Sequence, residues 1–135
     1  MSEVVVADSA CLIALEQIDQ LEVLPALFGA VLIPPEVDRE VGGLVRSWLT
    51  VEATRNFALV NSLKLILDAG EAEAIALANE RGLMVVLEDQ MARAVATDLK
   101  IPVIGTLGCL LKAKNAGAVA LLRPLLDELE LNPFS

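Results

Sequence analysis

Residues 4–15 read Val-Val-Val-Ala-Asp-Ser-Ala-Cys-Leu-Ile-Ala-Leu. The run of β-branched residues predicts a buried strand that ends at Asp8. Ser9 is expected to cap the helix that follows, with Leu12 and Leu15 on its apolar side. An apolar strand that passes directly into a helix is the unit from which parallel sheets are built, so this stretch predicts the fold class.

The same pattern recurs along the rest of the chain. Further apolar strands are predicted at residues 31–33, 84–87 and 101–104, with a shorter one at 48–51. Helices are predicted at residues 19–27, 35–41, 56–67, 68–82, 92–96, 107–115 and 119–130. Strands that alternate with helices predict an α/β fold in which a central parallel sheet is covered by helices on both faces.

Length and composition indicate one ordinary domain. The chain has 135 residues, and no linker, repeat or low-complexity tract divides it, so residues 1–135 are predicted to form a single domain. Hydrophobic residues make up 56% of the chain and aromatic residues only 3%, which predicts an aliphatic core. No apolar run approaches the roughly 20 residues of a membrane helix, and the first residues lack the basic region of a signal peptide. We therefore expect a cytoplasmic protein without a membrane partner.

The ionisable residues narrow the possible chemistry. The sequence contains no histidine, which excludes histidine general bases and nearly every zinc site. Its two cysteines, Cys11 and Cys109, are interpreted as small buried apolar residues. The formal net charge is −9, whereas a protein that binds nucleic acid by electrostatics alone should be basic. A nucleic-acid substrate would therefore require a divalent cation to offset part of this charge.

Two of the predicted strands end in acidic residues. Asp8 follows the first strand, and Glu88 and Asp89 follow the strand at residues 84–87. In open parallel sheets, ligands bind beyond the carboxyl ends of the strands. The structural alternative is that Asp8 and Asp89 only cap the helices that follow them, as aspartate often does. Two such residues in one sheet favour a binding site.

Two glutamates could add to this site. Glu40 lies on the helix that begins at Pro35, one turn after Glu36, and the alternative for it is a solvated helix face. Glu71 follows Asp68 by three residues, which is the spacing of a capping box. From this pattern alone, a capping role for Glu71 is favoured over a role in the site.

Five segments, taken in order, resemble the motifs of the PIN domain family. They are residues 6–15, with the strand-end Asp8; residues 33–41, with Glu40 on a proline-started helix; residues 70–78, with Glu71 opening an alanine-rich helix; residues 86–93, with Asp89; and residues 105–114. The last segment is similar to a tail of one PIN subfamily close to the VapC-like toxins. The resemblance runs from Val4 to about Leu126, and it implies a three-layer α/β/α PIN-like fold.

The resemblance also implies a Mg²⁺- or Mn²⁺-dependent ribonuclease, often the toxin of a toxin–antitoxin pair. Asp8, Glu71 and Asp89 would be the metal ligands, and Glu40 would complete the catalytic set. Oxygen-only ligands suit such hard cations. The implied auxiliary residues are Ser9, Glu88 and Thr106, and the implied RNA-binding residues are Arg93, Lys112 and Lys114. The implied partners are RNA, an antitoxin protein and a second copy of the chain in a homodimer.

Two other functions fit parts of the sequence. A catalytically weak PIN-like interaction or dimerisation module would agree with the acidic, aliphatic composition. A phospho-acceptor receiver domain would also place acids at strand ends. That class requires an acid pair after the first strand and a lysine after the last, where this chain has a single Asp8 and Gly105. The receiver interpretation is therefore rejected.

Overall fold

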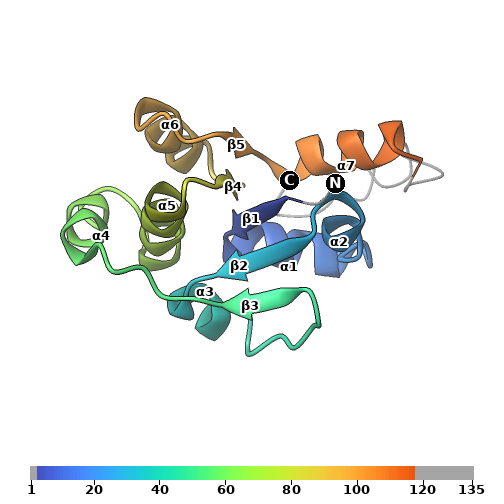
Figure 1. Cartoon of the computed structure of the whole chain (residues 1–135), viewed down its shortest axis with the longest axis horizontal. Helices are drawn as coiled ribbons and strands as arrows, with labels where there is room; N and C mark the ends of the chain where they lie inside the picture. Colours follow the sequence, from blue (N-terminus) through green and yellow to red (C-terminus); the bar gives the residue numbers. More distant parts are fainter. Residues whose placement is uncertain (1–2, 118–135) are drawn as a thin grey trace.

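The computed structural model describes residues 3–117, and its centre is a five-stranded parallel sheet (Figure 1). The strands are β1 (Val4–Ala7), β2 (Ala30–Ile33), β3 (Leu49–Val51), β4 (Met84–Val86) and β5 (Val103–Ile104). Their order in the sheet is β3-β2-β1-β4-β5, and every neighbouring pair is parallel. The chain therefore winds outward from β1 in one direction and outward from β4 in the other. The strand order reverses between these two strands.

Helices cover both faces of this sheet, which confirms the predicted three-layer α/β class (Figure 1). The helices are α1 (Ser9–Gln17), α2 (Val23–Leu27), α3 (Pro35–Glu40), α4 (Phe57–Leu63), α5 (Ala69–Arg81), α6 (Gln90–Asp98) and α7 (Thr106–Asn115). Side chains of α1, α2 and α7 pack with Val5 and Ala7 in one core cluster. Side chains of α4, α5 and α6 pack with Val6 in the other. The alternation along β1 thus feeds two cores, because successive side chains of a strand point to opposite faces.

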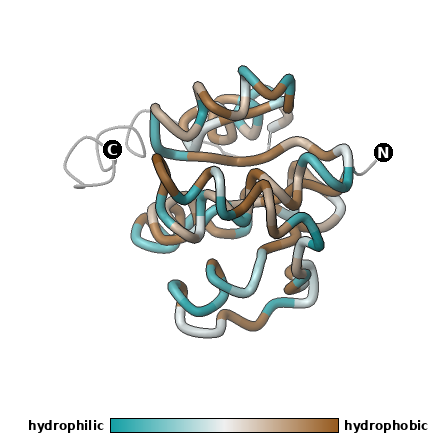
Figure 2. Tube along the Cα trace, turned by 90° about the vertical axis from the view of Figure 1, so that its left-hand side faces the viewer, coloured by the Kyte–Doolittle hydropathy of each residue, from teal (hydrophilic) through white to brown (hydrophobic). Residues whose placement is uncertain are grey.

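Both cores are aliphatic, as the composition predicts. The largest fully buried side chains are leucine, isoleucine and valine, among them Leu15, Ile33 and Ile75. Cys11 and Cys109 are buried free thiols, as expected. In Figure 2 the inner segments are mostly hydrophobic, and hydrophilic residues concentrate at turns and outer helical turns. None of the helices within residues 3–117 is long and apolar enough to cross a membrane.

Several predicted boundaries are wrong, each for a local reason. Asp8, and not Ser9, is the N-cap of α1. The predicted helix at residues 19–27 begins only at Val23, since Asp19 adopts a positive φ of 56° that interrupts a helix.

The other differences lie where the chain must turn. The predicted helix at residues 56–67 ends at Leu63, because the chain makes a turn before Asp68 takes the extended conformation that starts α5. The strand predicted at residues 101–104 is shortened to Val103–Ile104. The helix predicted at residues 119–130 lies outside the described residues.

Candidate functional site

The candidate site lies where the strand order of the sheet reverses. Asp8 directly follows β1, and Glu88 and Asp89 follow the neighbouring β4 by two and three residues. The Asp8 N–H donates to the carbonyl oxygen of Val86 at 3.1 Å, so the two strand ends are joined at this level. Open α/β sheets bind their ligands in the crevice beyond such a reversal. The strand-end acids therefore lie at the edge of the sheet where folds of this class bind their ligands.

Asp8 is almost completely buried, with 1% of its surface exposed. Its Oδ1 accepts from the Cys11 N–H at 2.9 Å, which caps α1, and its Oδ2 accepts from the Glu88 N–H at 3.2 Å. Burial raises the pKa of Asp8 from 3.8 to about 7, even though both hydrogen bonds act to lower it. The carboxylates of Glu88 and Asp68 raise the pKa further. Asp8 therefore caps a helix and is also a buried acid that titrates near neutral pH.

Glu71 combines the two interpretations that the sequence left open. The predicted capping box is present, since Asp68 Oδ1 accepts from the Glu71 N–H at 2.8 Å and Glu71 Oε1 accepts from the Asp68 N–H at 3.3 Å. Partial burial raises the pKa of Glu71 from 4.5 to about 7, and repulsion from Asp68, Asp89 and Asp8 adds to this rise. Glu71 is therefore a structural cap that also belongs to the group of acids around Asp8.

Asp68 belongs to the same group, although we did not predict it from the sequence. Its charge raises the pKa of both Asp8 and Glu71. The capping-box spacing already placed Asp68 one turn from Glu71. From that spacing we could have predicted that the charge of Asp68 influences the pKa of Glu71.

Glu40 is the last residue of α3 and joins the site through Ser9. The Ser9 hydroxyl donates to Glu40 Oε1 at 2.9 Å. Ser9 directly follows Asp8, so this hydrogen bond ties the end of α3 to the carboxyl end of β1. Ser9, an auxiliary residue in the set that the resemblance implies, therefore contacts Glu40 of the same set.

The end of β4 holds the remaining acids and Arg93. Asp89 Oδ2 accepts from the Ala92 N–H at 2.9 Å, so Asp89 caps α6. Glu88 Oε1 accepts from the Thr106 N–H at 3.3 Å. Arg93 donates to the carbonyl oxygens of Leu87 and Glu88, at 3.4 and 2.5 Å. The expected RNA-binding residue Arg93 is thus bound to the strand end beside the acids.

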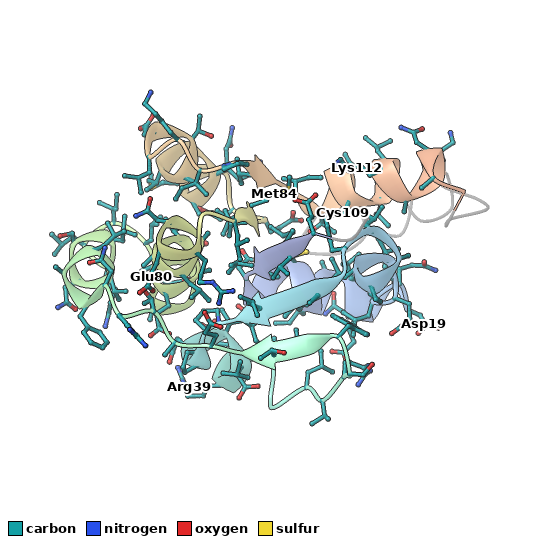
Figure 3. The ribbon with its side chains drawn as sticks, in the orientation of Figure 1. Asp19, Arg39, Glu80, Met84, Cys109 and Lys112 are labelled. Atoms are coloured by element: carbon teal, nitrogen blue, oxygen red, sulfur yellow. The ribbon has the colours of Figure 1, made fainter. Side chains whose placement is uncertain are left out.

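The other predicted auxiliary and RNA-binding residues lie on α7. Thr106 is buried in the first turn of α7. Within residues 3–117 its hydroxyl contacts only the Cys11 thiol, which is a weak hydrogen-bond partner. Lys112 and Lys114 are exposed in the last turn, and Lys112 is labelled on α7 in Figure 3. Because an α-helix rises about 1.5 Å per residue, these lysines lie roughly 9–12 Å from Thr106 along the helix axis. The structure does not bring them beside the carboxylates.

The acids suit a hard divalent cation by their chemistry, because all of them offer oxygen ligands. Repulsion within the group contributes to the raised pKa of Asp8 and Glu71, and a cation would relieve that repulsion. Within residues 3–117, however, no group of three or more His, Cys, Asp or Glu side chains could hold a metal ion as the side chains stand. The donor set fits a metal, while the side chains do not form a closed cage.

Comparison with known families agrees with this arrangement. A family model described as DUF3368, PIN domain, matches residues 4–134. The chain belongs to the PIN domain family. No curated protein matches it. PIN domains are typically nucleases and generally use divalent metals, and the five-stranded parallel sheet flanked by helices agrees with the PIN fold.

The double role of Asp68 in this PIN domain predicts different results for two substitutions. Asp68→Ala removes the N-cap of α5 and should lower the free energy of unfolding by about 1 kcal/mol. Asp68→Asn keeps a capping oxygen and removes the charge, so stability should change little while the pKa of Glu71 falls. Urea unfolding and carboxyl NMR titration measure the two effects. Equal destabilisation by both variants would contradict the capping role.

Proposed function

We propose that residues 1–135 form a single PIN domain that acts as a metal-dependent endoribonuclease. The observation that carries the proposal is Asp8, an acid buried at the point where the strand order reverses, whose pKa the carboxylates of Glu88 and Asp68 help to raise. Burying a charged carboxylate without a counter-charge is costly, and a chain that needed only a helix cap could use serine or asparagine. A site that receives a cation accounts for this burial.

In this proposal Asp8, Glu71 and Asp89 hold Mg²⁺ or Mn²⁺, and Glu40 completes the set. Each carboxylate oxygen that already accepts one N–H keeps a second lone pair. The longer glutamate side chains would turn toward Asp8 to close the site. The bound ion would supply polarisation of an RNA phosphodiester and a more acidic water molecule. Asp8 and Glu71 hold protons up to about pH 7 and would release them when the ion binds.

The RNA would approach from the side of α6 and α7. Arg93 is the cation beside the strand-end carbonyls, and its hydrogen bonds to them use only one of its guanidinium nitrogens. Since a guanidinium carries five N–H donors, Arg93 retains donors for a phosphate. Lys112 and Lys114 lie further along α7 and would contact more distant phosphates. The net charge of −9 predicts that such binding is weak without a divalent cation.

The family relationship supports three further parts of the proposal. The chain would act as the toxin of a toxin–antitoxin pair, bind an antitoxin protein, and form a homodimer. The alternative, a catalytically weak interaction module, is favoured by the open spacing of the acids within residues 3–117. The nuclease requires the acidic site for its activity, whereas the interaction module does not.

Cleavage of labelled RNA by the purified chain tests the proposal. We expect cleavage with millimolar Mn²⁺ or Mg²⁺, and none with chelator. Asp89→Asn should lower the rate roughly 10–100-fold, the scale on which changes around a metal reduce activity. Asparagine still caps α6, so this loss would not reflect unfolding. Asp98→Asn makes the same charge change at the far end of α6 and should leave the rate unchanged.

Two outcomes would count against the nuclease. One is a folded chain that cleaves no RNA with either metal. The other is cleavage that survives Asp89→Asn at the wild-type rate. An inactive chain that sediments as a stable dimer would instead support the interaction module.

A further inference from the structure

The carboxylate of Glu40 lies between two residues that adjoin the metal ligands of the proposed site. On one side the Ser9 hydroxyl donates to Oε1 at 2.9 Å. On the other side lies Gly70, the second residue of α5. Ser9 follows Asp8 and Gly70 precedes Glu71, so Glu40 connects the two parts of the chain that carry these acids.

Gly70 leaves the space that this carboxylate occupies. A Cβ atom built on Gly70 would lie 2.4 Å from Glu40 Oε1, 3.3 Å from Cδ and 3.5 Å from Oε2. The shortest of these distances is well below a van der Waals contact. A methyl group at position 70 would therefore displace the Glu40 carboxylate.

The backbone does not require a glycine at this position. Gly70 lies within α5 and is not among the glycines with positive φ, so alanine can adopt its conformation. The three heavy atoms nearest to the added Cβ all belong to the Glu40 side chain, and none of them is a backbone atom of α3. The first atoms that an added methyl group would meet are therefore those of the Glu40 carboxylate and not those of the α3 backbone.

We infer that Gly70 is a positioning residue, whose missing side chain sets where the Glu40 carboxylate lies. The inference rests on the proposed function, in which Glu40 completes the metal site. Gly70 itself touches neither metal nor substrate and acts through Glu40. Gly70 thus has a role in cation binding that is separate from its place in the helix.

Four variants test the inference in a double-mutant cycle: wild type, Gly70→Ala, Glu40→Ala, and the double variant. Two quantities are measured for each, the Mn²⁺ dissociation constant by calorimetry and the Tm in chelator. Gly70→Ala should weaken Mn²⁺ binding about tenfold, at the lower end of what changes around a metal site cost. Its Tm in chelator should not fall below the wild-type value, because alanine is the better helix residue. A merely structural role for Gly70 would lower the Tm instead.

The Glu40→Ala background is the matched control, since there the added methyl group has no carboxylate to displace. In that background Gly70→Ala should change the dissociation constant less than twofold. Equal losses of Mn²⁺ affinity in both backgrounds would overturn the inference, because coupling through Glu40 requires non-additivity. An unchanged affinity of Gly70→Ala in the wild-type background would overturn it as well.

Failure of the proposed function gives a different result. If the wild type binds no Mn²⁺, the metal-dependent nuclease fails, and the cycle is evaluated on the Tm values in chelator. The Gly70→Ala substitution should then raise the Tm more in the Glu40→Ala background than in the wild type, where it also breaks the Ser9 hydrogen bond. Additive Tm changes would overturn the positioning role.

Discussion

Asp8→Asn is expected to abolish the stabilisation of the protein by Mn²⁺. A ligand that binds only the folded state adds RT ln(1 + [L]/Kd), so Mn²⁺ at about 100 times its Kd should stabilise the wild type by about 2.7 kcal/mol. The variant should gain nothing, because it lacks the buried carboxylate that is the main metal ligand of the proposed site. RNA cleavage should fall roughly 1000-fold, the upper end of the loss caused by removing one electrostatic group. Thermal unfolding with chelator and with Mn²⁺ measures the first effect directly.

The Asp8→Asn substitution would not prevent folding, so a missing Mn²⁺ response can be interpreted. The asparagine side-chain oxygen can still accept from the Cys11 N–H and cap α1. The Glu88 N–H loses its acceptor, which costs about 1–3 kcal/mol. Above neutral pH, removal of the buried carboxylate charge should raise the free energy of unfolding and so offset part of this cost. Asp98→Asn, at the exposed end of α6, should respond to Mn²⁺ as the wild type does. A full Mn²⁺ response of Asp8→Asn would rule out Asp8 as a ligand.

The strand-end acids could be predicted from sequence because their positions depend on local pattern. The apolar runs before Asp8 and Asp89 specify buried strands, and parallel strands bring their carboxyl ends to one edge of the sheet. The spacing of Asp68 and Glu71 likewise specified the capping box that the structure contains. From the sequence, helix capping and ligand binding were alternative roles for these acids, whereas the structure allows both. A carboxylate has enough lone pairs to accept an N–H and still face the crevice.

The contacts that refine the site could not be predicted, because they join distant parts of the chain. The approach of Glu40 to Ser9 and Gly70 depends on how α3 packs beside α1 and α5. Arg93 was expected to bind RNA, and nothing in the sequence shows that it donates to the carbonyl oxygens at the end of β4. The end of α4 at Leu63 is also a tertiary effect, since residues 64–66 must turn the chain toward α5. Periodicity carries none of this information.

Without metal, the protein is expected to lose stability as the pH rises from about 4 to about 7. In this range the unfolded chain has already released the Asp8 proton, at a pKa near 3.8, while the folded protein retains it up to about pH 7. The folded state therefore binds more protons, and stability falls with rising pH. The raised pKa of Asp8 corresponds to on the order of 4 kcal/mol. Glu71 acts in the same direction, with a smaller effect because it is only partly buried and solvent screens its charge.

Urea unfolding of metal-stripped protein at pH 5 and pH 8 measures this loss. The wild type should have the lower free energy of unfolding at pH 8, and Asp8→Asn should show a much smaller difference between the two pH values. Glu36, whose pKa is lowered by its hydrogen bond with Arg39, and Glu80, whose pKa is lowered by the Arg55 N–H, act in the opposite direction. Glu36 is partly buried and Glu80 is exposed. Their effect on stability falls below the ordinary glutamate pKa of 4.5, outside the measured interval. A wild type that is equally stable at both pH values would show that Asp8 is not held as a buried acid. If Mn²⁺ restores at pH 8 the stability that deprotonation removes, the burial of Asp8 is explained by the cation that replaces its proton.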